Sequence, residues 1–464
     1  LNRIKELQIN CYLISGIFRR KQHFFSIYGN WFSNDLNAFY KEFGPNQVLY
    51  VDGKFDGTLN NFRFKNARIA SGETRVRGDF TIKDLISQDR EYSIIANNHY
   101  ITTSYYDLRR FMPRLIGKNL PKQLKSLGNF QFIGNTQITT STLNSKSNLK
   151  STIGNALVDI EVGSINDYEK ANYKGKIKVD NFNLGKLTET RSLENITADL
   201  TIKGSGFSQK SVNTSINGTV SSFDFEGYSY KNIIISGNLK DPVFNGDLSI
   251  DDPNVKLDFK GIVDVSKEFN QFVFEADIAF AELNKLNLIK RDSVSIFAGR
   301  LIMDMYGTTL DDARGTIRFK ETFYQNERDD YYFNDFNVIS RFEGKKRTIE
   351  INSPDIIDGN ISGVFKLEDI PNLFKNGIGK IYANYIPEEV ISDQYVNYQF
   401  TVYNKIIELF VPSLALGKNT QISGKVSSDE TKFKLNFKSP EILLFKNYLG
   451  NVNVEVDNNN PLYN

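Results

Sequence analysis

Cysteine is almost absent from this sequence, and its absence limits how the fold can be held together. The 464 residues include one cysteine, Cys11, so an internal disulfide is excluded. The residue before it, Asn10, is larger and more polar than a lipid-attachment motif requires, and we interpret Cys11 as a half-buried thiol. Packing and hydrogen bonds must therefore stabilise the fold.

Long apolar segments are also missing. No run of about 18 apolar residues occurs, so we expect no membrane-spanning helix, and no signal peptide is visible. The sequence starts at Leu1 without a methionine and stops at Asn464, and we expect both ends to be cuts through a longer protein. The compartment cannot be read from targeting signals.

Residues that would indicate catalysis or nucleic-acid binding are sparse. Lys and Arg number 57 and Asp and Glu 55, a net charge of +2 that gives no electrostatic case for nucleic acid. The two histidines, His23 and His99, have no cysteine or carboxylate at metal-ligand spacing. The pairs Asp251-Asp252 and Asp329-Asp330 fit solvated turns, and Gly204-Ser205-Gly206 lacks the third glycine of a nucleotide loop. We predict no enzyme, no metal and no cofactor.

What the sequence does contain is a repeated unit, a glycine followed by apolar residues at alternating positions. Strict alternation predicts β-strands with one apolar and one polar face, and the 36 phenylalanines and 23 tyrosines also favour sheet. Turn residues recur every 8–15 residues, roughly, which favours antiparallel hairpins. The unit occurs at Gly78–Ile82, Gly175–Val179, Gly218–Val220, Gly237–Leu239, Gly246–Ile250, Gly261–Val265, Gly299–Met303, Gly315–Phe319, Gly363–Phe365 and Gly424–Val426.

A sheet with one apolar face must cover that face, by stacking on a second sheet, by closing into a barrel, or by folding into a trough. Sandwich domains of about 100 residues would show recurring boundaries, and none is visible. We therefore predict an all-β fold, a long antiparallel sheet folded lengthwise into a taco-like groove. Residues 1–50 would form the first strands, and residues 51–464 a continuous groove without an internal boundary, whose apolar wall the chain itself leaves unfilled.

Two local features accompany this fold. The in-phase glycines would let strands bend sharply, although they could also merely mark strand starts after turns. Helical patterns are short, and we expect them to lie across the sheet as caps or wedges. They span Tyr106–Ile116, Pro121–Leu127, Leu184–Glu189, Ala281–Leu286, Glu368–Phe374 and Pro440–Leu444.

Ten segments of the chain share scaffold motifs rather than catalytic ones with a known family. They are Tyr173–Ile177, Asn183–Leu187, Val220–Phe223, Gly227–Ile233, Gly237–Gly246, Asp252–Phe259, Ala281–Asn287, Ile351–Ile357, Phe433–Pro440 and Asp457–Asn464. In these segments the sequence resembles the TamB proteins of Bacteroidota-type bacteria, which belong to the AsmA-like bridge proteins. The resemblance covers roughly Val51 to the end.

The resemblance implies a periplasmic β-groove that is anchored in the inner membrane and reaches the outer membrane. Proteins of this family are implicated in phospholipid transport between the membranes and in outer-membrane protein assembly with a barrel partner. The N-terminal anchor helix of the family is missing from this sequence, and so is any segment assignable to the family's C-terminal domain. The resemblance therefore leaves open whether this part of the protein takes part in anchoring or in docking a partner.

The function predicted from these patterns is phospholipid conduction along the groove. The alternative is a scaffold or chaperone for outer-membrane proteins, whose sheet edge would pair with a client strand. Asn238 and Lys256 should point outward. The predicted lining residues are Ile216, Val220, Ile233, Ile235, Leu239, Phe244, Leu248, Ile250, Val255, Leu257, Phe259, Phe272, Phe274, Ile278, Phe280 and Met303.

Two interpretations of individual side chains stay open. The predicted lining residues could instead be core packed on the opposite wall of the trough. The basic clusters Arg109-Arg110 with Arg114, and Lys345-Lys346-Arg347, fit solvated faces, with phospholipid headgroup contact as the alternative.

Overall fold

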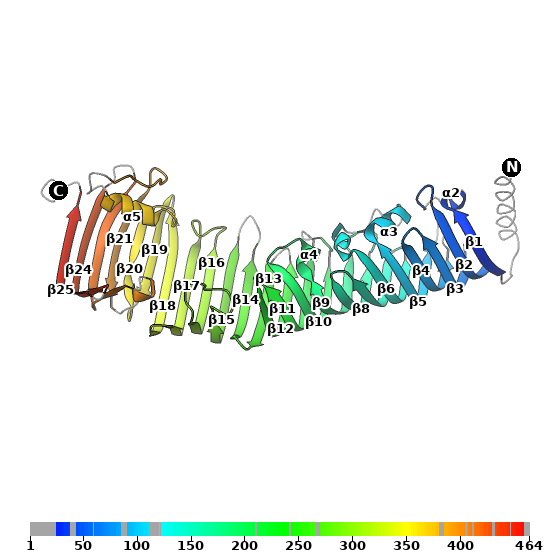
Figure 1. Ribbon diagram of the computed structural model, residues 1–464, viewed down its shortest axis with the longest axis horizontal. Coiled ribbons are helices and arrows are strands. Elements are labelled where there is room, and N and C mark those ends of the chain that lie inside the picture. Colours follow the sequence, from blue (N-terminus) through cyan, green and yellow to red (C-terminus); the bar gives the residue numbers. More distant parts are fainter. Residues whose placement is uncertain are drawn as a thin grey trace. The chain divides into compact units, whose positions relative to one another are not determined.

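The computed structural model describes residues 25–37, 43–58, 60–84, 91–111, 113, 120, 122–208, 211–240, 243–265, 270–379, 385–403, 407–410, 413–428, 432–445 and 447–458. The chain forms two compact units, Leu1–Asp241 and Pro242–Asn464. Nearly all regular structure in both is β-strand, which confirms the all-β class (Figure 1). The sequence predicts no boundary between Asp241 and Pro242. Proline, however, has no backbone N–H and cannot donate a hydrogen bond to a neighbouring strand. Cys11, His23 and Arg114 lie outside the described residues.

The described part of the N-terminal unit is a meander of antiparallel strands, each paired with the next along the chain. The strands are β1 (Phe25–Phe32), β2 (Val48–Gly57), β3 (Phe62–Ser71), β4 (Thr74–Lys83), β5 (Ser93–Ser104), β6 (Asn129–Thr139), β7 (Thr142–Ser151), β8 (Gly154–Gly163), β9 (Asn172–Asn183), β10 (Leu193–Ser205), β11 (Asn213–Phe225) and β12 (Tyr228–Lys240). The helices are α2 (Ser33–Leu36), α3 (Tyr105–Phe111), the 3-10 helix η1 (Lys122–Leu127) and α4 (Leu184–Thr188).

The described part of the C-terminal unit continues the same design. Its strands are β13 (Val243–Asp252), β14 (Val255–Asp264), β15 (Gln271–Glu282), β16 (Ser295–Tyr306), β17 (Arg314–Asn326), β18 (Asp330–Glu343), β19 (Lys346–Ser353), β20 (Ile357–Val364), β21 (Tyr395–Val402), β22 (Leu414–Leu416), β23 (Thr420–Ser427), β24 (Phe433–Leu444) and β25 (Asn447–Asp457). Its helices are α5 (Ile370–Gly379) and α6 (Ile407–Phe410). The short β22 breaks the order, because it pairs with β24 rather than with β23.

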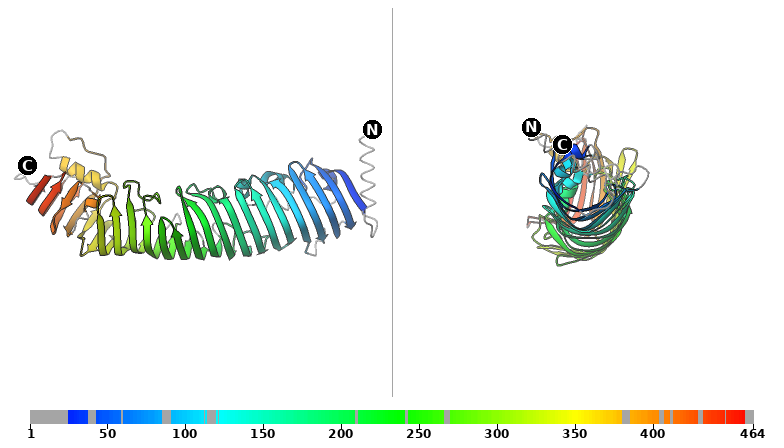
Figure 2. Two further views of the ribbon diagram at one scale, coloured as in Figure 1. Left: turned by 60° about the horizontal axis from the view of Figure 1, so that its bottom comes forward. Right: turned by 90° about the vertical axis from the view of Figure 1, so that its right-hand side faces the viewer.

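The strands form one open antiparallel sheet. Among the described residues, the first and last strands of neither unit pair with each other, so the sheet does not close into a barrel in either unit. Seen end-on in Figure 2, the strands of the N-terminal unit curve into a U-shaped section. The face of each sheet that carries the alternating apolar residues is called the inner face below, because the short helices pack on it.

Glycines inside strands, not only at their starts, allow this curvature. Gly175 lies within β9 with φ +156°, and Gly218 lies within β11 with φ +155°. A Cβ at these positions would overlap the carbonyl oxygens of Asp159 and Asp199 on the neighbouring strands. Only glycine combines this backbone conformation with such close strand contact. Close contact with the neighbouring strand therefore requires glycine at these two positions, and strand bending by the in-phase glycines stays a prediction.

Four of the six predicted helical segments are helical, and two are not. The helices α3, η1, α4 and α5 overlap their predicted ranges. Residues 283–287 form turns after β15, and Pro440–Leu444 belongs to β24. The prediction of a helix over Pro440–Leu444 is wrong because Ile442 pairs with Leu416 on one side and with Leu449 on the other. These two strand pairings hold the segment extended. Among the described helices, none is long and apolar enough to cross a membrane.

Candidate functional site

The strand register of the C-terminal unit places most of the predicted lining residues on one face. Residues directly opposite each other on paired strands share a face. Leu248 pairs with Phe259 and Ile250 with Leu257, and Phe274 pairs with Met303. The inner face of β13–β16 is therefore a continuous apolar surface.

Aromatic rings run across this surface from strand to strand. The ring centroids of Phe244 and Phe259 are 6.5 Å apart, and those of Phe259 and Phe274 are 5.0 Å apart. Distances in this range are typical of favourable aromatic pairs. The three rings lie on three consecutive strands, so the row crosses the strands in the direction in which the groove would extend.

The last two strands of the N-terminal unit show the same arrangement. Val220 pairs with Ile233, and Ile235 faces the unsubstituted Gly218. Ile216 likewise faces Gly237. A glycine opposite each isoleucine leaves the isoleucine side chain uncovered by its cross-strand partner.

Most of the predicted lining residues are less buried than packed core. Four of the sixteen predicted lining residues, Val220, Ile233, Ile250 and Val255, are buried, and the others are partly exposed. In the described part of the chain, none of the sixteen belongs to a hydrophobic core cluster. They contact one another along the sheet while one side remains accessible, as expected for the wall of a groove.

Phe280 departs from the predicted pattern. A one-residue register shift in β15 pairs Phe280 with Lys256, whose side chain is exposed, and Ala281 with Val255. The alternation that runs from Phe272 to Ile278 therefore does not extend to Phe280. A β-bulge of this kind reverses the side-chain phase and cannot be read from apolar spacing.

The opposite face of the sheet is polar, as predicted. Asn238 and Lys256 are exposed. Ion pairs link neighbouring strands on this face, including Lys174 with Glu161 at 2.8 Å and Arg300 with Asp277 at 2.6 Å. Exposed pairs contribute at most about 1 kcal/mol each, so they mark a solvated surface more than they stabilise it.

The inner face is not open along its whole length, which corrects the prediction of an unfilled apolar wall. In the N-terminal unit, Leu124 and Leu127 of η1 and Leu187 of α4 pack against Phe130 and Phe182 of the strands.

In the C-terminal unit, α5 packs on β20, β21, β23 and β24. Leu283, Ile289 and Ile407 of α6 belong to a further cluster that includes Phe297 of β16 and Phe336 of β18. The open surface includes β11–β12 in one unit and β13–β15 in the other.

Further apolar residues lie on the inner face beyond those predicted. Leu301 pairs with Phe319, which in turn pairs with Phe336, and Phe336 also packs on the core cluster around Tyr331. The ring centroids of Phe319 and Phe336 are 6.2 Å apart. Leu301 and Phe319 belong to the repeats that begin at Gly299 and Gly315, so the alternation in these repeats could have predicted both residues on the inner face.

A buried polar chain interrupts the inner face of the N-terminal unit at β5–β7. His99 Nε2 lies 2.8 Å from the Thr136 hydroxyl, which lies 2.9 Å from Ser145, and Ser145 lies 2.9 Å from Ser147. His99 Nδ1 lies 3.2 Å from the Phe132 carbonyl oxygen. Because a carbonyl only accepts, Nδ1 carries the proton of the neutral ring, and Nε2 accepts from Thr136. With an exposure of 1%, His99 is buried more deeply than the sequence indicated.

Burial lowers the pKa of His99, and this makes stability depend on pH. The unfolded chain binds the His99 proton near pH 6.5, whereas the folded protein resists it, so stability falls as the pH drops below that value. Between pH 7.5 and 5.5, we expect the free energy of unfolding of the wild type to fall more steeply than that of His99→Gln. The difference in slope should reach up to about 1.4 kcal/mol per pH unit. Urea denaturation at both pH values measures the difference, and equal slopes would contradict it.

The two basic clusters differ from each other. Arg109 and Arg110 are exposed on α3, as the solvated-face interpretation expects. Arg347 is only 4% exposed, and it donates to the Ser340 hydroxyl and the Ala313 carbonyl, at 3.0 Å each. Burial lowers the pKa of Arg347. The solvated-face interpretation is wrong for Arg347, which fastens residues 311–313 to β19.

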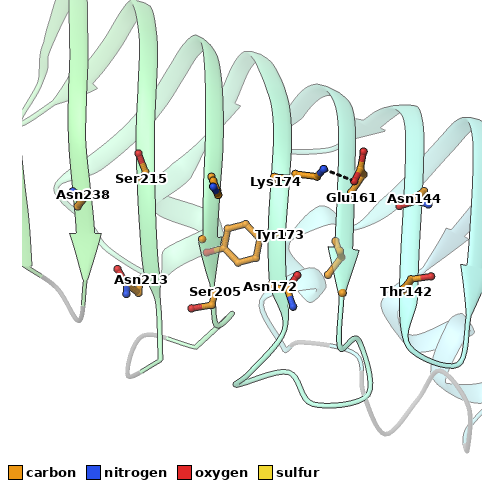
Figure 3. Close-up of a pocket in the computed structure, with 14 residues that line it drawn as sticks. Thr142, Asn144, Glu161, Asn172, Tyr173, Lys174, Ser205, Asn213, Ser215 and Asn238 are labelled. Carbon is orange, nitrogen blue, oxygen red and sulfur yellow. Dashed lines mark ion pairs between the residues drawn. The ribbon is translucent and has the colours of Figure 1, made fainter.

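A polar hollow of about 660 Å³ lies on strands β7–β12 of the N-terminal unit. Figure 3 shows Asn144, Glu161, Lys174 and Asn238 projecting from neighbouring strands around it, with the Lys174–Glu161 ion pair at its centre. All four are exposed. The described residues contain no group of three His, Cys, Asp or Glu side chains that could hold a metal ion. The hollow offers ordinary hydrogen-bonding groups and no recognisable reaction centre.

Comparison of the chain with protein-family models, with curated proteins and with solved structures found no match. The chemistry of the open inner face therefore carries the functional interpretation.

Proposed function

We propose that this chain is part of a periplasmic bridge that conducts phospholipid between the inner and outer membranes, with the acyl chains on the inner face of the sheets. The observation that carries the proposal is the apolar inner face of β13–β15, on which most side chains are partly exposed. A soluble protein gains nothing by exposing such a surface unless something apolar covers it. The resemblance to TamB supports the choice of phospholipid as cargo and of an inner-membrane anchor.

The energetics explain why a groove suffices. Exposing an acyl chain to water costs about 0.8 kcal/mol per CH₂ group, so two ordinary chains present a barrier of roughly 20 kcal/mol or more. A continuous apolar wall removes most of this barrier, because the chains stay out of water while the headgroup remains solvated. No reaction chemistry is required.

Photo-crosslinking tests the proposal. A photoreactive amino acid at Ile235 or Phe259, on the inner face, is expected to label phospholipid in cells or with vesicles. The same amino acid at Asn238 or Lys256, on the exposed face of the same strands, is expected not to. Mass spectrometry of the labelled protein measures both, and equal labelling at the two pairs of positions would reject conduction along the inner face.

The second candidate, a scaffold for outer-membrane proteins, is favoured by one observation. Among the described residues, β25 pairs on one side only, with β24, and it contains no proline or lysine, the residues that commonly protect sheet edges. Its Tyr448 and Leu449 are exposed. A crosslinker at Tyr448 that captured a β-barrel protein, with no lipid captured at Phe259, would favour the scaffold over the conduit.

A further inference from the structure

An apolar cavity of about 260 Å³ lies between helix α5 and the inner face of the C-terminal sheet. Figures 1 and 2 show α5 on the strands β20–β24. The helix contributes Ile370, Phe374 and Ile378, which are spaced by four residues and so share one side of the helix. The sheet contributes, among others, Phe400 and Ile422.

Among the described residues that line the cavity, one side chain carries a polar atom, the Tyr398 hydroxyl, and it donates to the Lys434 carbonyl at 3.0 Å. Burial raises the pKa of Tyr398 to about 12, so the hydroxyl stays neutral. Apolar cavities of roughly 150 Å³ stay free of water and bind small apolar molecules, which makes this larger cavity suited to an apolar ligand.

The helix is fixed in place by hydrogen bonds at both ends, so the cavity is preformed. Near its start, Gln394 Nε2 donates to Asp369 at 2.6 Å, and Gln394 Oε1 accepts from the Lys366 backbone at 2.6 Å. Near its end, the Asn376 amide donates to the Glu388 carbonyl at 2.9 Å and accepts from the Glu388 N–H at 2.8 Å. Preformed cavities bind ligands without a cost for ordering the wall.

Size and access narrow the ligand further. Pockets for drug-sized molecules begin at about 300 Å³, so this cavity is too small for a two-chain lipid and fits one narrow chain. Ile378 lines the cavity and is also 43% exposed, which places an opening to solvent beside it. A chain could therefore extend out of the cavity and leave a polar headgroup in water.

We propose that this cavity is a binding site for a single alkyl chain on the inner face of the C-terminal unit. The inference rests on the proposed function in taking an alkyl chain as cargo, but it concerns a separate place in the C-terminal unit. The same chemistry could come from a free fatty acid or from one tail of a phospholipid, and the experiment separates these sources.

The test uses the whole chain with palmitate that carries a diazirine near its methyl end, and in parallel with a phospholipid that carries the same tail. After illumination, mass spectrometry maps the labelled peptides. Labelling of peptides that contain α5 is expected in the wild type. Labelling by palmitate alone would identify a free-chain site, and labelling by both would identify a site that also admits one phospholipid tail.

Ile422→Trp fills the cavity and is expected to reduce α5 labelling at least tenfold, while labelling of β13–β15 stays unchanged. Leu248→Trp, the same enlargement on the open inner face, is the matched control and should leave α5 labelling intact. If circular dichroism shows that Ile422→Trp does not fold, Ile361→Phe fills the cavity from β20 with a smaller change in volume.

The possible failures are distinguishable. If wild-type β13–β15 is labelled and α5 is not, the cavity is a packing defect and this inference falls while the conduit stands. If α5 is labelled by palmitate and β13–β15 is labelled by neither probe, the cavity stands and the conduit falls. Unchanged α5 labelling in a folded Ile422→Trp or Ile361→Phe variant would also overturn the inference.

Discussion

Phe259→Asp is expected to lower phospholipid transfer by at least about 30-fold without unfolding the protein. Phe259 lies in the middle of the open inner face, where its ring neighbours Phe244 and Phe274. An ionised carboxylate at this position would lose contact with water whenever an alkyl chain passes over it. Burying it there costs about 2 kcal/mol or more, which corresponds to the 30-fold loss. Transfer of a fluorescent phospholipid between donor and acceptor vesicles measures the rate.

A matched control places the same charge on the other face. Asn245→Asp changes an exposed residue of β13, the strand that pairs with β14, and should leave the transfer rate within about twofold of wild type. Circular dichroism and thermal unfolding establish that both variants are folded. An unfolded Phe259→Asp would mean that Phe259 is core, and a folded variant with normal transfer would mean that lipid does not pass Phe259.

The fold class and most of the inner face could be predicted from periodicity, because alternation is a direct consequence of strand geometry. Leu248, Phe259, Phe274 and Met303 share a face because each pairs, directly or through a neighbour, in the register that alternation implies. The same principle fails at Phe280. A bulge there shifts the phase by one residue, and no feature of the local sequence indicates the shift.

Long-range packing could not be predicted in the same way. The pattern around Glu368–Phe374 indicates a short helix but not which face of the sheet it covers, and α5 occupies part of the predicted groove. Arg347 and His99 are similar cases. Both are polar residues that the sequence assigns to the surface or its margin, and both are buried because backbone carbonyls from other segments satisfy their hydrogen bonds.

Gly175→Ala is expected to destabilise the N-terminal unit by about 1–3 kcal/mol more than Gly29→Ala. The two glycines have nearly the same backbone conformation, with φ of +156° and +153°. They differ in surroundings, because a Cβ at Gly175 would overlap the Asp159 carbonyl oxygen, whereas a Cβ at Gly29 has no atom within 4 Å. Both variants carry the strain of a positive φ, so their difference isolates the steric cost of bending one strand tightly against the next.

Thermal unfolding of the two variants gives the comparison, and each kcal/mol corresponds to about 2–4 °C in Tm for a unit of this size. Gly218→Ala provides an independent repeat. It has φ +155° and would overlap the Asp199 carbonyl oxygen, so it should behave like Gly175→Ala. If all three variants lost the same stability, the curvature of the sheet would depend on backbone conformation alone. If Gly175→Ala and Gly218→Ala lost more, close contact with the neighbouring strand would be the reason that these positions require glycine.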